Sequence, residues 1–110
     1  MSNMAETNSA AKEPSAQLLP KLVMKGVDMS QEEVQFATQV ARKGFVALQK
    51  SEVRYWQDVA QMLKNEFEQR YKGMWHVIVG QHFGAFVTHE AHHMIYFTIG
   101  HVSFLIYKHG

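Results

Sequence analysis

The residues most able to do chemistry in this chain are its histidines, and all seven lie after residue 75. His89-Glu90-Ala91-His92-His93 matches the pattern H-E-x-x-H, in which two histidines bind zinc and the glutamate acts as general base. That chemistry needs a helix, because positions i and i+4 then place both imidazoles on one face. A zinc-dependent hydrolase that uses His89, Glu90 and His93 is therefore one hypothesis.

The sequence on both sides of this motif indicates strands instead of a helix. Four short runs after residue 74 are rich in β-branched and aromatic residues and are separated by Gly or His. They cover residues 75–80, 83–89, 93–99 and 102–108. The H-E-x-x-H pattern falls where the second run passes into the third, so we interpret it as a turn that binds no metal. No nucleophile elbow, P-loop or dinucleotide fingerprint occurs either, and we predict no catalytic residue and no cofactor.

Two helices are predicted ahead of these strands. Ser30 and Glu33 have the spacing of a capping box, which predicts a helix that begins after Ser30 and runs to about Gln49. A second helix ends at Lys72-Gly73. Its apolar stripe recurs at helical spacing and consists of Trp56, Val59, Ala60, Leu63, Phe67 and Tyr71.

The order of these elements predicts an α+β fold with both helices on one face of an antiparallel β-sheet. A short first strand is possible at residues 22–24, before Gly26. On the second helix, Glu66 and Arg70 have the i,i+4 spacing of an ion pair. Residues 1–20 show no periodicity and are expected to be a flexible tail, ahead of one domain at residues 21–110.

Composition excludes several classes of function. The net charge is +1, and residues 1–71 carry equal numbers of acidic and basic side chains. The chain therefore has no excess of basic residues that would indicate binding to nucleic acid or to an anionic membrane. There is no cysteine, and no apolar run approaches the roughly 20 residues of a membrane span. We expect neither nucleic acid nor membrane as a partner.

The run at residues 83–89 is the strongest candidate for a binding element. It carries no charge and no proline, so it lacks the usual protection of an edge strand. Such an edge is either buried by self-assembly or used to recruit another strand, whereas a central strand would need no explanation.

The same stretch carries a family resemblance. Trp75-His-Val-Ile-Val-Gly80, then Phe83-Gly-Ala-Phe-Val-Thr-His-Glu90, and the end Leu-Ile-Tyr-Lys-His-Gly110 closely resemble the smallest dynein light chains. The match is dense over residues 75–110, weaker over 22–30 and 65–71, and absent from the tail. The resemblance implies a strand-swapped homodimer whose two sheets form a β-sandwich. It also implies a non-catalytic hub adaptor of the dynein motor in the cytoplasm and cytoskeleton, with a possible place in the axoneme.

The resemblance further implies that disordered partners add to the sheet by β-augmentation, and that the dimer promotes their dimerisation. Those partners include dynein intermediate chain and other proteins with Thr-Gln-Thr-like motifs. The implied peptide-binding groove consists of Phe83, Gly84, Ala85, Phe86, Val87, Thr88, Tyr96 and Gln57. The implied dimer interface consists of His76, Phe83, Ala85, Val87 and His89. An imidazole buried at position 76 would be kept neutral, so the dimer is expected to weaken as pH falls.

Three departures from the family pattern affect the groove. Ala85 and Phe86 replace a serine and a tyrosine, and Gln57 stands where the family has a charged residue. A structural dynein subunit with a degenerate groove is therefore the alternative hypothesis.

Overall fold

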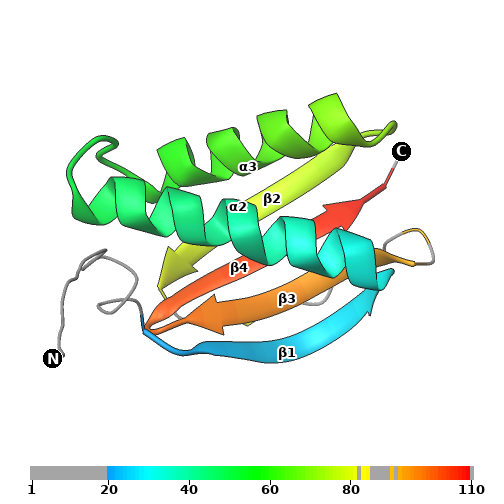
Figure 1. The fold of residues 1–110 in the computed structure, drawn as a ribbon, viewed down its shortest axis with the longest axis horizontal. Helices are drawn as coiled ribbons and strands as arrows, with labels where there is room; N and C mark the ends of the chain where they lie inside the picture. The colour runs from blue at the N-terminus through cyan, green and yellow to red at the C-terminus, as the bar shows by residue number, and fades with distance from the viewer. Residues whose placement is uncertain (1–19, 82, 85–89, 91, 110) are drawn as a thin grey trace, which may run out of the picture.

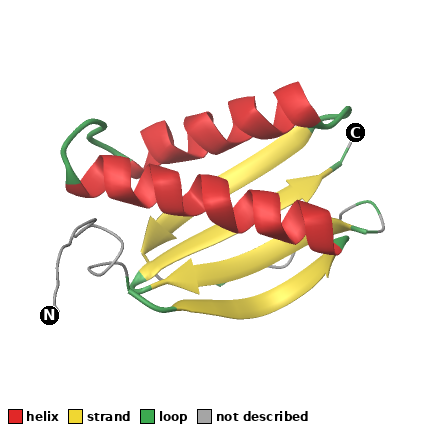
Figure 2. Ribbon diagram, viewed as in Figure 1, coloured by secondary structure: helices red, strands yellow, loops and turns green. Residues whose placement is uncertain are grey.

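The computed structural model describes residues 20–81, 83–84, 90 and 92–109. It shows one four-stranded antiparallel sheet with two helices lying across one face, as predicted (Figures 1 and 2). The elements are β1 (Leu22–Met29), α2 (Gln31–Gln49), α3 (Trp56–Arg70), β2 (Trp75–Gln81), β3 (His93–Ile99) and β4 (Val102–Lys108).

Helix α2 begins where the sequence predicts. The Ser30 hydroxyl accepts a hydrogen bond from the Glu33 backbone N–H, and Glu33 Oε1 accepts one from the Ser30 backbone N–H, each at 3.2 Å. This reciprocal capping box satisfies two of the backbone donors that a helix start leaves unpaired. The helix ends at Gln49, and Ser51 follows with a positive φ of 61°.

Helix α3 is capped by Asp58, whose carboxylate accepts the backbone N–H groups of Arg54 and Tyr55 at 3.2 and 3.1 Å. The predicted ion pair between Glu66 and Arg70 was wrong. Glu66 lies 3.6 Å from Lys43, and Arg70 lies 3.5 Å from Glu32. Both partners belong to α2. The two helices lie close enough together for these long side chains to form ion pairs between the helices instead of along α3.

A glycine allows this close approach of the helices. A Cβ at Gly44 of α2 would lie 2.8 Å from Val59 Cγ1 and 3.4 Å from Leu63 Cδ1 on α3. Glycine costs a helix interior about 1 kcal/mol relative to alanine. The tight contact explains why glycine is nevertheless present at this position.

The sheet has the strand order β1-β3-β4-β2, so β1 and β2 are its edges. Strand β1 runs to Met29 and is longer than predicted, because its pairing with β3 continues past an irregularity between Met24 and Gly26. The predicted strand at residues 83–89 falls largely outside the described residues, and residues 83 and 84 belong to no described strand.

The core lies between the helices and the sheet. Apolar residues of α2 and α3 pack over strand side chains that alternate toward this face. Its largest fully buried members are Trp75, Phe67, Phe97, Phe104, Leu63, Ile95 and Ile99. Neither described helix is both long and apolar enough to cross a membrane.

Candidate functional site

The candidate site lies on the sheet face that the helices leave uncovered. Successive strand residues point to opposite faces, so the neighbours of core residues Ile95, Phe97 and Ile99 point away from the helices. Tyr96 and Thr98 are two of these neighbours. Thr98 pairs across the sheet with Ser103 of β4, which places both hydroxyl-bearing residues on this outward face.

Phe83 and Gly84 lie against this face. The Phe83 ring stacks on Tyr96 with a centroid separation of 5.7 Å and an angle of 12° between the rings. The Tyr96 hydroxyl donates a hydrogen bond of 2.6 Å to the Phe83 carbonyl oxygen. One tyrosine of β3 thus holds both the ring and the backbone of the residue that begins the predicted binding strand.

A hollow of about 490 Å³ opens beside this contact. The hollow combines apolar ring surface with side chains that can donate hydrogen bonds to backbone carbonyls. Such a surface suits an extended peptide, because the peptide brings unpaired carbonyl and N–H groups along both edges. Among its lining residues are Lys25, Phe83, Gly84, Tyr96, Thr98, His101 and Ser103.

The structure brings together three of the predicted groove residues, Phe83, Gly84 and Tyr96. Gln57 does not join them within one chain, because it lines a separate hollow where α2 passes into α3. Five other predicted groove and interface residues lie outside the described residues; they are Ala85, Phe86, Val87, Thr88 and His89.

His76 is half-buried on edge strand β2. Its ring stacks on Tyr107 of β4 at 5.1 Å, and its Nε2 lies 3.0 Å from the carbonyl oxygen of His109. That nitrogen donates to the carbonyl whenever it carries a proton. The contact holds the end of the chain beside the start of β2.

The H-E-x-x-H pattern does not form a helix at its described positions. Glu90 donates its backbone N–H to the Lys108 carbonyl at 2.9 Å, His92 has a positive φ of 68°, and His93 opens strand β3. Within the described ranges, no group of three His, Asp or Glu side chains could hold a metal ion. His89 lies outside the described residues, and the described positions Glu90 and His93 do not lie on the helix that the zinc chemistry needs.

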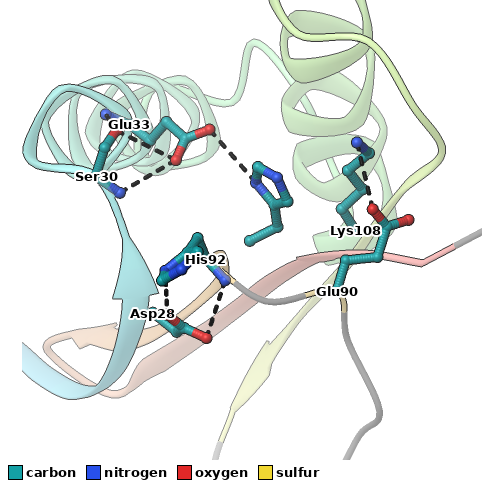
Figure 3. Close-up of polar contacts among 7 residues, drawn as sticks. Asp28, Ser30, Glu33, Glu90, His92 and Lys108 are labelled. Carbon is teal, nitrogen blue, oxygen red and sulfur yellow. Dashed lines mark hydrogen bonds and ion pairs between the residues drawn. The ribbon is translucent and has the colours of Figure 1, made fainter.

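Polar contacts hold the chain on both sides of position 91 (Figure 3). His92 donates its backbone N–H to Asp28 Oδ2 at 3.1 Å, and Glu90 forms an ion pair of 3.4 Å with Lys108. His93 Nδ1 lies 3.6 Å from the carboxylate of Glu33, the residue that completes the capping box. The turn after the predicted binding strand is thereby tied to β1, α2 and β4.

A lysine on α3 fixes the start of β2. Lys64 Nζ donates to the Trp75 carbonyl oxygen and to Glu68 Oε2, each at 2.7 Å. The hydrogen bond from Lys64 lowers the pKa of the Glu68 carboxyl below its usual value, because it favours the charged form.

The sequence interpretation missed five of the residues that line the hollow, namely Lys25, Thr98, Gly100, His101 and Ser103. Thr98 and Ser103 could have been found from strand alternation, since Thr98 lies two residues after Tyr96 and therefore shares its face. Lys25 could not, because its direction depends on the irregularity in β1. His101 lies in the β3–β4 turn, where no periodicity applies.

Comparison with known proteins decides the family. The family model described as dynein light chain type 1 matches residues 21–109. The chain belongs to this family. Members are non-catalytic light chains, which agrees with the absence of a helical zinc motif at the described positions.

The relatives agree with this family. The protein named "Dynein light chain, cytoplasmic" of Emericella nidulans is 42% identical over 98 residues, which cover 89% of this chain and 97% of that protein. The dynein light chain-like domain of the Fasciola hepatica calcium binding protein FhCaBP2 has a TM-score of 0.65 at 22% identity, over 83% of this chain and 93% of that chain. A mercury derivative of the same domain gives a TM-score of 0.63 at 23% identity, over 81% and 92%. These two structures show the shared fold.

Proposed function

We propose that this dynein light chain acts as a dimeric hub adaptor that binds short linear motifs of disordered partners and promotes their dimerisation. The observation that carries the proposal is the seating of Phe83 on Tyr96 beside the hollow of the outward sheet face. It supports the proposal because Phe83, at the start of the uncharged segment, and Tyr96 both line the hollow in which a peptide strand is proposed to lie.

Dimerisation is supported by the outward face and by edge strand β2. Ile78 of β2 points away from the core and has 43% of its surface exposed, and His76 lies on the same side. Among the described residues, β2 pairs only with β4, and no described strand pairs with the backbone donors and acceptors of its other edge. The proposed dimer satisfies them by adding residues 83–88 of a second subunit to this edge.

Peptide binding is proposed to use the other edge of the exchanged strand. The client backbone then forms ladder hydrogen bonds with that strand, and Lys25, Thr98 and Ser103 line the surface on which its side chains lie. Gln57 of the second subunit is proposed to complete the groove, since within one chain it faces a different hollow. The clients are dynein intermediate chain and other proteins with Thr-Gln-Thr-like motifs, in the cytoplasm and on the cytoskeleton.

The first test is calorimetric titration of a Thr-Gln-Thr-containing peptide at neutral pH, with sedimentation of the same sample. One peptide per chain on a dimer is the expected result. A dimer that shows no heat at high peptide concentration would instead support the structural subunit with a degenerate groove.

A matched pair of variants locates the peptide site. Tyr96→Phe removes the hydroxyl that holds the Phe83 carbonyl, and should weaken peptide binding about fivefold to tenfold, the value of one hydrogen bond of about 1 kcal/mol or slightly more. Tyr71→Phe makes the same change at a buried hydroxyl that has no hydrogen-bond partner in the described part of the chain. Equal affinities of the two variants would place the peptide elsewhere.

A further inference from the structure

A second hollow lies between the end of α2 and the start of α3. It has a volume of about 730 Å³. Leu48, Val53 and Trp56 give it an apolar lining, and Tyr55 on its rim has 61% of its surface exposed. An open aromatic and aliphatic surface of this kind is typical of a binding site.

The described chain begins beside the β3–β4 turn, whose His101 packs against Trp56 in the lining of this hollow. Pro20 lies against the β3–β4 turn, where a Cβ at Gly100 would be 2.9 Å from the Pro20 ring, and the Gly100 N–H donates to the Lys21 carbonyl at 3.3 Å. His101 of the same turn packs edge-on against Trp56 with a centroid separation of 6.4 Å. The start of β1 and the α2–α3 loop accordingly lie at the same end of the molecule (Figure 1).

The residues that precede Pro20 match the chemistry of the hollow. Leu18 and Leu19 come immediately before it, in a terminal segment whose other large apolar residues are Met1 and Met4. A residue before proline favours an extended conformation, and an extended residue spans about 3.4 Å, so two or three residues reach about 10 Å. The ring centroids of His101 and Trp56 are 6.4 Å apart, which is shorter than this reach.

We propose that the N-terminal segment docks on its own domain, with Leu18 and Leu19 seated in the hollow between α2 and α3. Tethering favours this occupant over a free peptide or a second copy, because a short tether gives an effective concentration of about millimolar. Docking covers Trp56 and places the segment beside Gln57.

The two tryptophans of the chain provide the test. Trp75 is fully buried, whereas Trp56 lines the hollow. In the full-length protein, Leu18→Ser with Leu19→Ser should release the segment and raise the acrylamide quenching constant about twofold, because Trp56 then becomes accessible. Met4→Ser makes the same kind of apolar-to-polar change nearer the N-terminus, and it should leave the quenching constant unchanged.

Two further measurements identify the occupant. In a Trp56→Phe background only Trp75 fluoresces, and the leucine substitutions should then have no effect on quenching. Backbone amides of residues 17–19 should show slower motion by heteronuclear NMR relaxation in the natural sequence than in the double-serine variant.

The proposal is overturned if the double-serine variant and the natural sequence quench equally. It is also overturned if protection of Trp56 depends on protein concentration in both, which would assign the hollow to a second copy. No client peptide is present in these measurements, so their outcome does not depend on client binding.

Discussion

The two faces of the sheet differ in what covers them. On the helix side, Trp75, Phe97 and Phe104 are completely buried. On the other side, Tyr96 is only half-buried and Ile78 is 43% exposed, although isoleucine and aromatic residues fill the core. The first face is closed by helices of the same chain, whereas the second presents apolar surface that one chain does not fully cover.

This difference indicates a division of roles between the two faces of the sheet: the helix face contributes to folding stability, and the outward face is available for binding. Burial of large side chains supplies the folding free energy, and the helix face does so within one chain. An outward face with half-buried aromatic rings and unpaired edge groups gains most from a second chain. The predictions below test this division.

The largest expected effect compares one large side chain from each face of β3. Phe97→Ala should lower the free energy of unfolding by about 3–5 kcal/mol, because it opens a cavity in a fully buried site against Phe104. Met94→Ala on the outward face should cost about 1 kcal/mol or less in the monomer, since that side chain is only partly buried. Urea denaturation of both variants measures the difference, and equal costs would refute the division.

A second comparison uses two glycines. Gly44→Ala should destabilise by about 1–3 kcal/mol despite the better helix propensity of alanine, because its Cβ would lie 2.8 Å from the stiff Val59 side chain. Gly26→Ala on β1 meets only Met94 Cε at 3.9 Å and should be nearly neutral. If Gly44→Ala were stabilising, the helix layer would be packed more loosely than the structure shows. Val59→Ala in the Gly44→Ala background should restore part of the loss.

A third prediction compares the two sheet edges. Ile78→Asp on β2 should weaken dimerisation at least tenfold, or about 1.4 kcal/mol, by placing a charge where a second subunit is proposed to pair. Val23→Asp on β1 changes a side chain of matching exposure, 42% against 43%, and should leave the dimer intact. Sedimentation at several concentrations measures both. Equal effects would mean that the interface is not confined to the β2 edge.

The smallest effect concerns Glu68. Because Lys64 lowers its pKa in the folded state, Glu68 contributes stability at neutral pH that is lost as pH falls through that lowered value. NMR titration of the Glu68 carboxyl should show a lowered pKa in the natural sequence and a return toward the usual value in Lys64→Met.

The sequence predicted the elements whose causes are local. The capping box of α2 depends on two residues three positions apart, and strands β2, β3 and β4 show β-branched and aromatic runs; all were confirmed. Strand β1 extends five residues past the predicted Met24, because pairing with β3 sustains it where local propensity is weak.

The candidate site was less predictable because it is assembled from distant residues. Tyr96 was identified only through the family resemblance, whereas Phe83 also begins the uncharged run at residues 83–89. Their direct contact joins positions 13 residues apart. Lys25 and His101 come from an irregular strand and a turn, and only the folded chain places them beside Tyr96. The ion pairs of Glu66 and Arg70 likewise depend on how the helices lie together, which spacing along one helix does not reveal.

The strand order also has a mechanical consequence. Strands β1 and β4 both run antiparallel to β3, so the domain begins at one end of the sheet and finishes at the opposite end (Figure 1). Tension applied between Lys21 and His109 therefore acts along the strands, while ladder hydrogen bonds lie perpendicular to them. All bonds of the β1–β3 and β3–β4 ladders then share the load in shear and cannot open one at a time. Forced unfolding, whose rate is set by the unfolding barrier, should consequently be slow when this domain is pulled by its ends.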